Sequence, residues 1–358
     1  MKEMKALILS GGTGSRLRPL TYTGAKQLLP VANRPILFYA IDAMVEAGLT
    51  DIGVVVGDTA QEIQEALGDG SRFHCQFTYI HQAKPLGLAH AVKTAQPFLG
   101  DSPFCVFLGD NLLRVGVKNT VDRFRRDQPD ASILLAEVPD PRQFGVAVVE
   151  GDRVVRLVEK PAEPPSHYAL VGTYCFTPAI HPIINDLTPS WRNEYEITDA
   201  IQGLIDSGHR VDAAYVNGWW KDTGRPEDLL DANRLILEDF EGQVRGAVDA
   251  ESVVTGRVEI GAGSQIVNSV IRGPVSIADN VRISHAYVGP YTSIGSNVTL
   301  ERVEIENSVV MADTRIAHLR PRIADSLIGR GVNIHGEERR PSTLKVVLGD
   351  KSELHWVP

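Results

Sequence analysis

The sequence predicts an α/β domain with a mainly parallel sheet, followed by a parallel β-helix. Over about the first 240 residues, short apolar runs alternate with stretches whose apolar residues have helical spacing. From about residue 253 the helical spacing ends, and apolar residues recur every five or six positions. Every third of them recurs 17 residues later, at Val254, Ile271, Val288 and Ile305. The first pattern is typical of an α/β fold with helices on both faces of the sheet, and the second is typical of stacked β-coils.

Four short apolar runs are expected to form buried parallel strands, because a strand that is covered on both faces needs no polar alternation. They span residues 6–9, 52–56, 104–108 and 132–136. A helix is expected over residues 36–47, with Gly48 as its C-terminal cap. Its apolar residues at helical spacing are Leu37, Ile41, Met44 and Val45. In such folds ligands bind beyond the carboxyl ends of the strands.

The repeat in the second part predicts a continuous apolar core, since each coil buries few side chains and stacking joins them. Further inward positions are expected at Ile260, Ile266, Ile277, Ile283, Ile294, Leu300, Ile316, Ile323 and Ile328. Corners are expected at Gly261, Gly273, Asn280, Gly289 and Gly295. A linker helix is expected at about residues 226–240, and the repeat is expected to end before the charged residues 337–340. The alternative is a generic β-rich tail.

Composition narrows the class of protein. The chain has 358 residues, which suggests about two domains at roughly 100–200 residues each. It has 36 Lys and Arg against 45 Asp and Glu, a net charge of −9, which argues against a nucleic-acid partner. Its three cysteines are far apart and have no metal-ligand spacing, as in reduced cytosolic proteins. No leader peptide and no run of ~20 apolar residues is visible, so we expect a cytoplasmic protein without a membrane partner.

A glycine-rich loop follows the first expected strand and indicates phosphate binding. It contains Gly11, Gly12, Gly14, Ser15 and Arg16. Glycines allow a tight turn that brings backbone N–H groups close to phosphate oxygens, and a following helix N-terminus would add a favourable dipole. Arg16 and the downstream Lys26 can neutralise a triphosphate. No Gly-Lys-Ser/Thr follows, so the loop is not a Walker motif, and a simple tight turn is the alternative.

The loop and the motifs after it resemble the sugar-nucleotide pyrophosphorylase family, and within it the long thymidylyltransferases that act on glucose 1-phosphate. The matching segments are 11–17, 26–31, 82, 85–89, 108–111, 144–146, 159–161, 196–199 and 220–224. The resemblance covers about residues 4–240. It implies a Rossmann-like nucleotidyltransferase domain over residues 1–242, and a left-handed parallel β-helix domain over residues 243–358. It also implies that dTTP and glucose 1-phosphate give dTDP-glucose and pyrophosphate, with Mg²⁺ as cofactor.

Two aspartates are candidate metal ligands. Asp110 follows the apolar run 104–108, and a carboxylate at the carboxyl end of a buried strand is well placed to hold Mg²⁺ against phosphates. Asp222 would supply a second carboxylate, and both match the family's metal ligands. Helix capping or turn formation is the alternative for each.

The resemblance also assigns residues to the two substrates. Gln82 would read the carbonyl and N–H edge of thymine or uracil, with Pro85 and Gly87 beside it, where any side chain would crowd the base. Taken alone, Gln82 is more readily explained as an ordinary surface amide. The sugar 1-phosphate would be held by Gly145, Glu159, Lys160, Gly172 and Arg192. Asn193 and Tyr195 depart from the usual pattern beside Arg192.

The implied chemistry needs no strong base, because the attacking sugar phosphate is already an anion. Arg16 and Lys26 are then the catalytic residues. We expect a homo-oligomer. Three other functions stay open: a UTP-using sugar-1-phosphate uridylyltransferase, a non-catalytic nucleotide-sugar-binding homologue, and an acyltransferase in the coils, where His285 and His318 are candidate bases.

Overall fold

The computed structural model describes residues 2–22 and 24–336, which divide into two compact units. Unit 1 comprises residues 1–13, 24–28 and 36–222, and unit 2 comprises residues 14–23, 29–35 and 223–358. The chain therefore divides at residue 222, and two short N-terminal segments belong with the C-terminal unit. The functional division at residue 242 stays a prediction, and the charged residues 337–340 lie outside the described residues.

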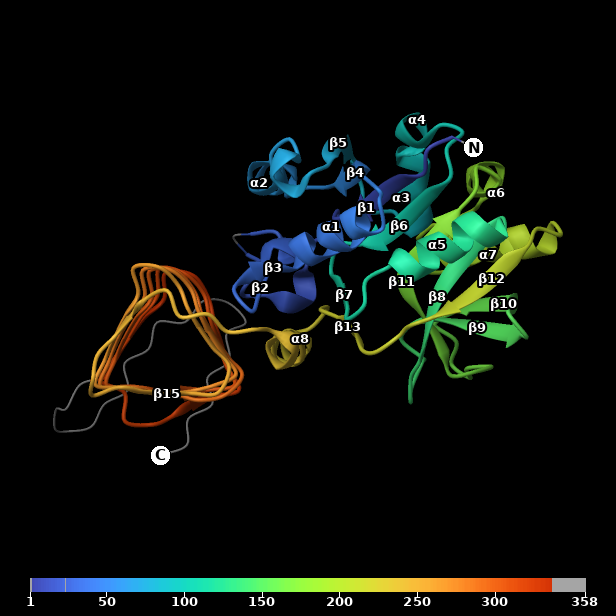
Figure 1. The fold of residues 1–358 in the computed structure, drawn as a ribbon. Helices are drawn as coiled ribbons and strands as arrows, with labels where there is room; N and C mark the ends of the chain where they lie inside the picture. Colours follow the sequence, from blue (N-terminus) through green and yellow to red (C-terminus); the bar gives the residue numbers. More distant parts are fainter. Residues whose placement is uncertain (1, 23, 337–358) are drawn as a thin grey trace. The chain divides into compact units, whose positions relative to one another are not determined.

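Unit 1 is built on a nine-stranded sheet (Figure 1). Its strands, in spatial order, are β5 (Gln76–His81), β4 (Asp51–Val56), β1 (Lys5–Leu9), β6 (Phe104–Leu108), β11 (Tyr168–Phe176), β8 (Ala131–Glu137), β12 (Val211–Tyr215), β10 (Arg153–Glu159) and β9 (Gly145–Glu150). The pairings make β11 and β10 antiparallel to the other seven strands. The expected mainly parallel sheet is confirmed, with two reversed strands that the sequence pattern did not predict.

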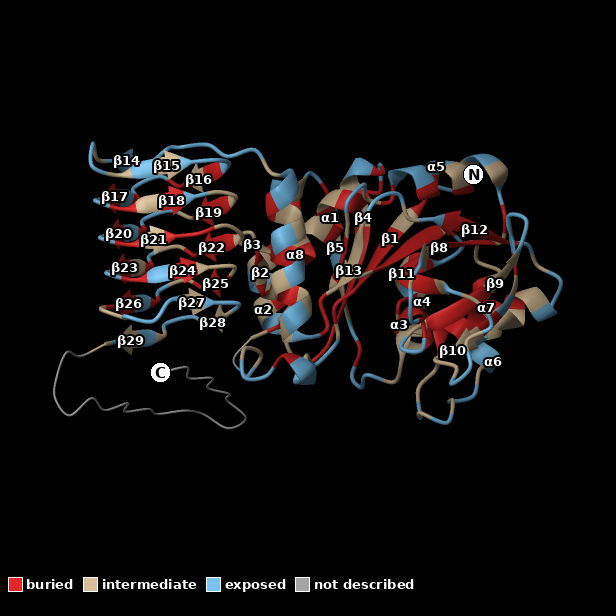
Figure 2. Ribbon diagram, turned by 90° about the horizontal axis from the view of Figure 1, so that it is seen from below, coloured by how far each residue is buried: buried red, intermediate tan, exposed pale blue. Residues whose placement is uncertain are grey.

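Helices cover both faces of this sheet. Along β1, Ala6 and Ile8 face one apolar cluster, while Leu7 and Leu9 face another. The first cluster includes α1 (Ile36–Glu46), α2 (Ala60–Leu67) and α5 (Lys118–Asp127), and the second includes α3 (Leu88–Thr94), α4 (Gln96–Leu99), α6 (Ile180–Asp186) and α7 (Ile197–Asp206). Alternate residues of one strand are thus buried on both sides, which explains its continuous apolar run (Figure 2).

Helix α1 forms where its periodicity predicts and ends at the expected glycine. Leu37, Ile41 and Met44 are buried, and Val45 packs partly buried beside them. Gly48 has φ +72°, and the N–H of Leu49 donates to the carbonyl of Met44, so a left-handed cap ends the helix.

The C-terminal part of unit 2 is a stack of coils. Its strands form three parallel sheets, ordered β14-β17-β20-β23-β26-β29, β15-β18-β21-β24-β27 and β16-β19-β22-β25-β28. The strands are short: Ala247–Val248, Val253–Thr255, Val258–Ile260, Gln265–Val267, Val270–Arg272, Val275–Ile277, Arg282–Ser284, Tyr287–Val288, Thr292–Ile294, Thr299–Glu301, Glu304–Glu306, Val309–Val310, Arg315–Ala317, Ile323–Ala324, Leu327–Ile328 and Asn333–His335 for β14 to β29. Val254, Ile271, Val288 and Ile305 stack in register. The expected parallel coil is therefore present, and helix α8 (Pro226–Asp239) precedes it as expected.

The corner residues of the coil have two different backbone conformations. Asn280 has φ +59°, as a left-handed corner requires. The four expected corner glycines, Gly261, Gly273, Gly289 and Gly295, do not have positive φ among the described residues. A Cβ added at Gly295 would lie 2.6 Å from the backbone nitrogen of Ala312 in the next coil. These glycines therefore permit close stacking.

Two observations bear on the environment of the chain. Within residues 2–22 and 24–336, no helix is long and apolar enough to span a membrane. Cys75, Cys105 and Cys175 are unpaired and buried.

Candidate active site

The site forms where β1 and β6 end side by side. The two strands are parallel with Leu9 opposite Leu108, and the N–H of Gly109 donates to the carbonyl of Leu9 at 2.9 Å. Gly11 and Asp110 are thus the residues that leave the sheet at this edge. A Cβ at Gly109 would lie 2.7 Å from the Ser10 hydroxyl oxygen, so this close approach requires glycine.

Lys26 lies against Asp110. It opens the short 3₁₀ turn Lys26–Leu28, and its Nζ forms an ion pair with Asp110 Oδ2. The two side chains are only 11% and 20% exposed, so the pair is shielded from water. Two of the predicted site residues are therefore brought together, and a cation already stands at the carboxylate expected to bind a metal.

Asp222 joins this edge through a short antiparallel pair. Strand β13 (Trp220–Asp222) pairs with β7 (Asn111–Leu113), and Asp222 is opposite Asn111, the neighbour of Asp110. Asp110 thus directly precedes β7, and Asp222 is the last residue of the strand that pairs with β7. Among the described residues, no group of three or more His, Cys, Asp or Glu is placed to hold a metal. The two carboxylates of Asp110 and Asp222 fit Mg²⁺, which is usually held by one or two carboxylates together with substrate phosphates.

Gln82 is buried, so it is not the surface amide that the sequence left open. Its backbone N–H donates to Val56, and a Cβ at Gly11 would lie 3.2 Å from its Oε1. Its Nε2 lies 2.8 Å from Nδ1 of His90 and 3.4 Å from the carbonyl oxygen of Gly87. The amide oxygen therefore faces the start of the glycine-rich loop.

His90 orients Gln82, a role that the sequence analysis did not predict. Burial, and then the charge of Lys93, lowers the pKa of His90, which favours the neutral ring. An amide nitrogen only donates, so Nδ1 of His90 accepts and the neutral ring carries its proton on Nε2. The signal available in the sequence was only the helical position of His90 in α3, directly after the predicted Gly87 turn.

Gly87 has a structural reason of its own, besides the role predicted for it beside the base. It has φ +108°, and a Cβ there would lie 2.5 Å from the carbonyl oxygen of Tyr195. The N–H of Tyr195 donates to Leu86, and the N–H of Ala89 donates to Tyr195. The glycine thus allows the segment expected at the base to pair with the segment 190–196 expected at the sugar. The predicted crowding of the base by a side chain at this position stays a prediction.

Gly145 and Glu159 come together on the predicted sugar side. They are directly opposite in the β9–β10 pair. A Cβ at Gly145 would lie 2.5 Å from Thr198 Cγ2 and 3.2 Å from Glu159 Oε2. Thr198 Oγ1 in turn donates to Glu159 Oε2 at 3.1 Å. Thr198, which lies in the first turn of helix α7 and was not assigned a role, therefore fixes the carboxylate, and glycine at position 145 leaves room for its methyl group.

Glu159 is surrounded by cations. Its Oε1 lies 3.3 Å from Nη1 of Arg192 and 3.8 Å from Nζ of Lys160. Burial raises the pKa of Glu159, while Lys160, the Thr198 hydroxyl and Arg192 act in the opposite direction. Arg192 also contacts Glu194 and Glu196 at 3.1 and 3.2 Å. Arg192 is thus held by three carboxylates, and its role as a phosphate ligand stays a prediction.

Gly172 lies beside an incompletely bonded amide. It has φ +76° in β11, where the ladder to β8 shifts register, and a Cβ there would lie 2.5 Å from Asn111 Nδ2. Asn111 donates to the carbonyl of Val171, while its buried Oδ1 has no partner in the described structure. The same holds for Oε1 of buried Gln27, next to Lys26. Each of these two oxygens can accept a hydrogen bond from a bound water or a polar ligand.

The second half of the glycine-rich loop belongs to unit 2. Gly14 has φ +62°, and its carbonyl accepts from Thr21 Oγ1 at 2.8 Å. Ser15 and Arg16 lie in the 3₁₀ turn Ser15–Leu17, so the expected helix N-terminus after the loop is absent from the described residues. A three-residue turn has no useful dipole. Arg16 and Pro85 stay predicted ligands.

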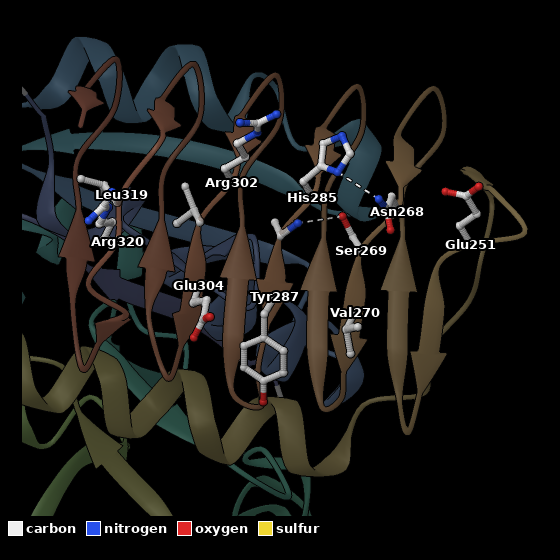
Figure 3. Close-up of a pocket in the computed structure, with 12 residues that line it drawn as sticks. Glu251, Asn268, Ser269, Val270, His285, Tyr287, Arg302, Glu304, Leu319 and Arg320 are labelled. Carbon is white, nitrogen blue, oxygen red and sulfur yellow. Dashed lines mark hydrogen bonds between the residues drawn. The ribbon is translucent and has the colours of Figure 1, made fainter. Parts of the chain in front are cut away.

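A separate pocket of about 570 Å³ lies on the coil (Figure 3). Figure 3 shows His285 pointing toward Asn268, and the two side chains are 3.0 Å apart. His318 lies 3.6 Å from Glu301 and is not among the residues that line this pocket. The two histidines considered as bases for acyl transfer thus do not converge there.

Comparisons with known proteins give a consistent result. A family model described as nucleotidyl transferase matches residues 5–239. A glucose-1-phosphate thymidylyltransferase of Streptomyces antibioticus is 49% identical over 353 residues, 98% of this chain and 99% of that protein. A low-salt glycan biosynthesis nucleotidyltransferase of Haloferax volcanii is 51% identical over 356 residues, 98% and 99% of the two chains. The crystal structure of a putative glucose-1-phosphate thymidylyltransferase from Bacillus anthracis is similar with a TM-score of 0.63 and 36% identity, over 67% of this chain and 98% of that one.

Proposed function

This chain belongs to the nucleotidyl transferase family, and we propose that it transfers the thymidylyl group of dTTP to glucose 1-phosphate, forming dTDP-glucose and pyrophosphate. The main observation that supports nucleotidyl transfer is the shielded Lys26–Asp110 ion pair. It lies next to Asp222, at the edge where the glycine-rich loop leaves the sheet. The full-length likeness to a thymidylyltransferase supports the choice of substrates.

The reaction is an in-line displacement. A phosphate oxygen of glucose 1-phosphate attacks the α-phosphorus, the bond from that phosphorus to the bridging oxygen breaks, and pyrophosphate leaves with that oxygen. Asp110 and Asp222 would hold Mg²⁺, which supplies positive charge against the phosphate oxygens. Lys26 neutralises charge at the same edge, and we assign Arg16 to the triphosphate. Holding two anions together is the main catalytic task, because the nucleophile needs no deprotonation.

Glu159 and Lys160 would serve the sugar phosphate. Glu159 is held by the Thr198 hydroxyl, with the cations of Arg192 and Lys160 nearby, so its carboxylate is oriented before a sugar hydroxyl arrives. A side chain at Gly145 would crowd this carboxylate, since an added Cβ would lie 3.2 Å from Glu159 Oε2. We propose that Lys160 pairs with the sugar phosphate as a compact charge.

Gln82 would read the pyrimidine. Its short contact to His90 fixes the amide, whereas its 3.4 Å contact to the Gly87 carbonyl is long and can be replaced by a base carbonyl. Its Oε1 would accept the ring N–H of thymine or uracil. Cytosine has an unprotonated nitrogen there, which leaves the buried Gln82 oxygen unpaired at a cost of about 1–3 kcal/mol.

We further propose that the coil is left-handed and that the enzyme is a cytoplasmic homo-oligomer. Three buried free cysteines suit a reducing compartment. Exposed Val248, Val253 and Val267 on the first coils offer apolar surface to another subunit.

A pyrophosphate-release assay tests the function. With glucose 1-phosphate and Mg²⁺, dTTP should have the highest kcat/KM. UTP should be used with a kcat/KM that is lower by roughly 10–200-fold, because one methyl in an apolar pocket contributes ~1–3 kcal/mol. CTP should be used less well than UTP by a further factor of roughly 5–150, which corresponds to about 1–3 kcal/mol for the unpaired Gln82 oxygen, and ATP and GTP should be refused. A preference for UTP would identify a uridylyltransferase, and no release with any triphosphate would indicate a non-catalytic binding protein.

A further inference from the structure

The side-chain amide of Gln82 has two orientations, and only one of them suits the base proposed above. With its oxygen toward the base, the amide accepts from the ring N–H of thymine or uracil, and its nitrogen donates to the neighbouring carbonyl. Rotated by half a turn, the same amide would donate to the unprotonated ring nitrogen of cytosine and accept from its amino group. Both orientations fill nearly the same space, so the groups that fix the amide also decide which base is read.

Two acceptors lie beside the amide nitrogen of Gln82. Its Nε2 is 2.8 Å from Nδ1 of His90 and 3.4 Å from the carbonyl oxygen of Gly87. The distance to Gly87 is long for a hydrogen bond, so the contact to His90 is the one that holds the amide. If the amide were rotated, its oxygen would face Nδ1 and the Gly87 carbonyl oxygen, which would leave three acceptors together without a donor.

His90 is itself held by its neighbours. It is half-buried in the first turn of α3, and its ring packs against the ring of Tyr195, with centroids 6.0 Å apart and planes inclined by 30°. The backbone of Tyr195 is bonded in turn to Leu86 and Ala89. Burial, and then the charge of Lys93, lowers the pKa of His90, so the ring is neutral at neutral pH. The acceptor Nδ1 therefore has a defined place beside Gln82.

We propose that His90 is a positioning residue that sets the base specificity of nucleotidyl transfer. By accepting from Gln82, it keeps the amide oxygen toward the base, which admits thymine and uracil and disfavours cytosine. The proposal rests on the proposed function and on the reading of the base by Gln82. Without this acceptor, only the 3.4 Å contact to Gly87 opposes the rotated amide. Discrimination against cytosine should then fall by the value of about one hydrogen bond, which is roughly 2–12-fold.

The test compares dUTP with dCTP, which share one sugar, lack the methyl group and differ only at the edge that Gln82 would read. The measured quantity is the ratio of their kcat/KM values for pyrophosphate release by the full chain with glucose 1-phosphate and Mg²⁺. His90→Leu and His90→Asn form a matched pair, since the two new side chains have the same shape and only asparagine offers an acceptor at the δ position. His90→Leu should lower the ratio of dUTP to dCTP roughly 2–12-fold, and His90→Asn should keep most of it.

Thr94→Val is the control for the position of helix α3. It removes a hydroxyl that donates to the backbone carbonyl of His90 at 2.8 Å, and it retains Nδ1. The ratio of dUTP to dCTP should be unchanged in this variant. An equal fall in Thr94→Val and His90→Leu would show that the place of the helix, and not the acceptor, decides the ratio, and would overturn the proposal.

A double-mutant cycle decides whether His90 acts through Gln82. In the Gln82→Ala enzyme, adding His90→Leu should not change the ratio further. The proposal would be overturned by a further fall there, by an unchanged ratio in His90→Leu alone, or by a fall in His90→Asn as large as that in His90→Leu. Should His90→Leu fail to fold, His90→Ala takes its place in the same cycle. Absence of pyrophosphate release by the unsubstituted enzyme would instead refute the proposed function, and the ratio of the dissociation constants of dUTP and dCTP, measured by calorimetry, would then test His90.

Discussion

Replacing Gly145 by alanine should weaken sugar binding by a mechanism that the geometry defines. The new Cβ would lie 2.5 Å from Thr198 Cγ2, well inside the 3.5–4.0 Å of a favourable carbon contact. Thr198 must therefore move, and its hydroxyl then loses the 3.1 Å bond to Glu159. Overpacking costs about 1–3 kcal/mol, and a hydrogen bond to a charged group contributes about 1.5–3 kcal/mol.

Movement of one side chain relieves part of this cost. We therefore expect transition-state stabilisation to fall by about 2 kcal/mol, which lowers kcat/KM for glucose 1-phosphate roughly 30-fold. Initial rates of pyrophosphate release at saturating dTTP measure it. Thr198→Ser removes Cγ2 but keeps the hydroxyl, so Gly145→Ala with Thr198→Ser should recover most of the loss. The KM for dTTP should stay within about twofold in all variants.

Two outcomes would refute this reasoning. An unchanged KM for glucose 1-phosphate in Gly145→Ala would show that Glu159 does not serve the sugar. A double variant as poor as the single one would show that the steric conflict is not with Thr198 but with the ligand or with Glu159 Oε2, which lies 3.2 Å from the added Cβ.

Three further outcomes are expected. Asp110→Asn should reduce turnover by roughly 10²-fold or more across a Mg²⁺ titration, the scale of lost preorganised charge, and near-normal activity at low Mg²⁺ would contradict the metal role. Lys160→Ala should raise the KM for glucose 1-phosphate more than that for dTTP in steady-state kinetics, and the reverse would move Lys160 to the nucleotide. Because burial raises the pKa of Glu159 and Arg192 opposes that rise, Arg192→Gln should raise it further. The acid limb of the pH profile for glucose 1-phosphate, which reports loss of the ionised carboxylate as the pH falls, should then shift to higher pH, and a shift to lower pH would exclude Glu159 as the titrating group.

Periodicity predicted the elements well because burial imposes it directly. Ile271, Val288 and Ile305 recur at a constant interval since each fills the same place in successive coils. The reversed strand β11 has no such signal, because an apolar strand buried on both faces reads alike in either direction. Strand β10, in which Arg153 and Arg156 are exposed, has a pattern that likewise carries no sign of direction. Residues 29–35 were not assigned to the coil unit for another reason, which is that their contacts are distant in sequence. Their contacts to Asn233 and Ser276 join parts of the chain about 200 and 240 positions apart.

The site residues were predictable only where chemistry and motif coincide. Asp110 follows a buried strand and Lys26 lies in a recognised motif, so their charges could be assigned to the candidate site from the sequence. The structure pairs the two side chains. The burial of Gln27 and Asn111 and the contact of His90 with Gln82 depend on how the chain folds around them, which no local motif states. A polar side chain gives no sequence signal for whether it faces water, another amide or a ligand.

Three glycines of the candidate site have structural reasons that the sequence motifs did not reveal. Gly87 makes room for the Tyr195 backbone, Gly145 for the Thr198 methyl, and Gly172 for the Asn111 amide. Each of these glycines therefore lies where two segments of the candidate site are in close contact. A Cβ at Gly145 conflicts with a side chain that a second substitution can shorten, whereas at Gly87 it conflicts with backbone at positive φ. It follows that Thr198→Ser can rescue Gly145→Ala, but that no substitution at Tyr195 can rescue Gly87→Ala, since every residue there keeps the carbonyl oxygen.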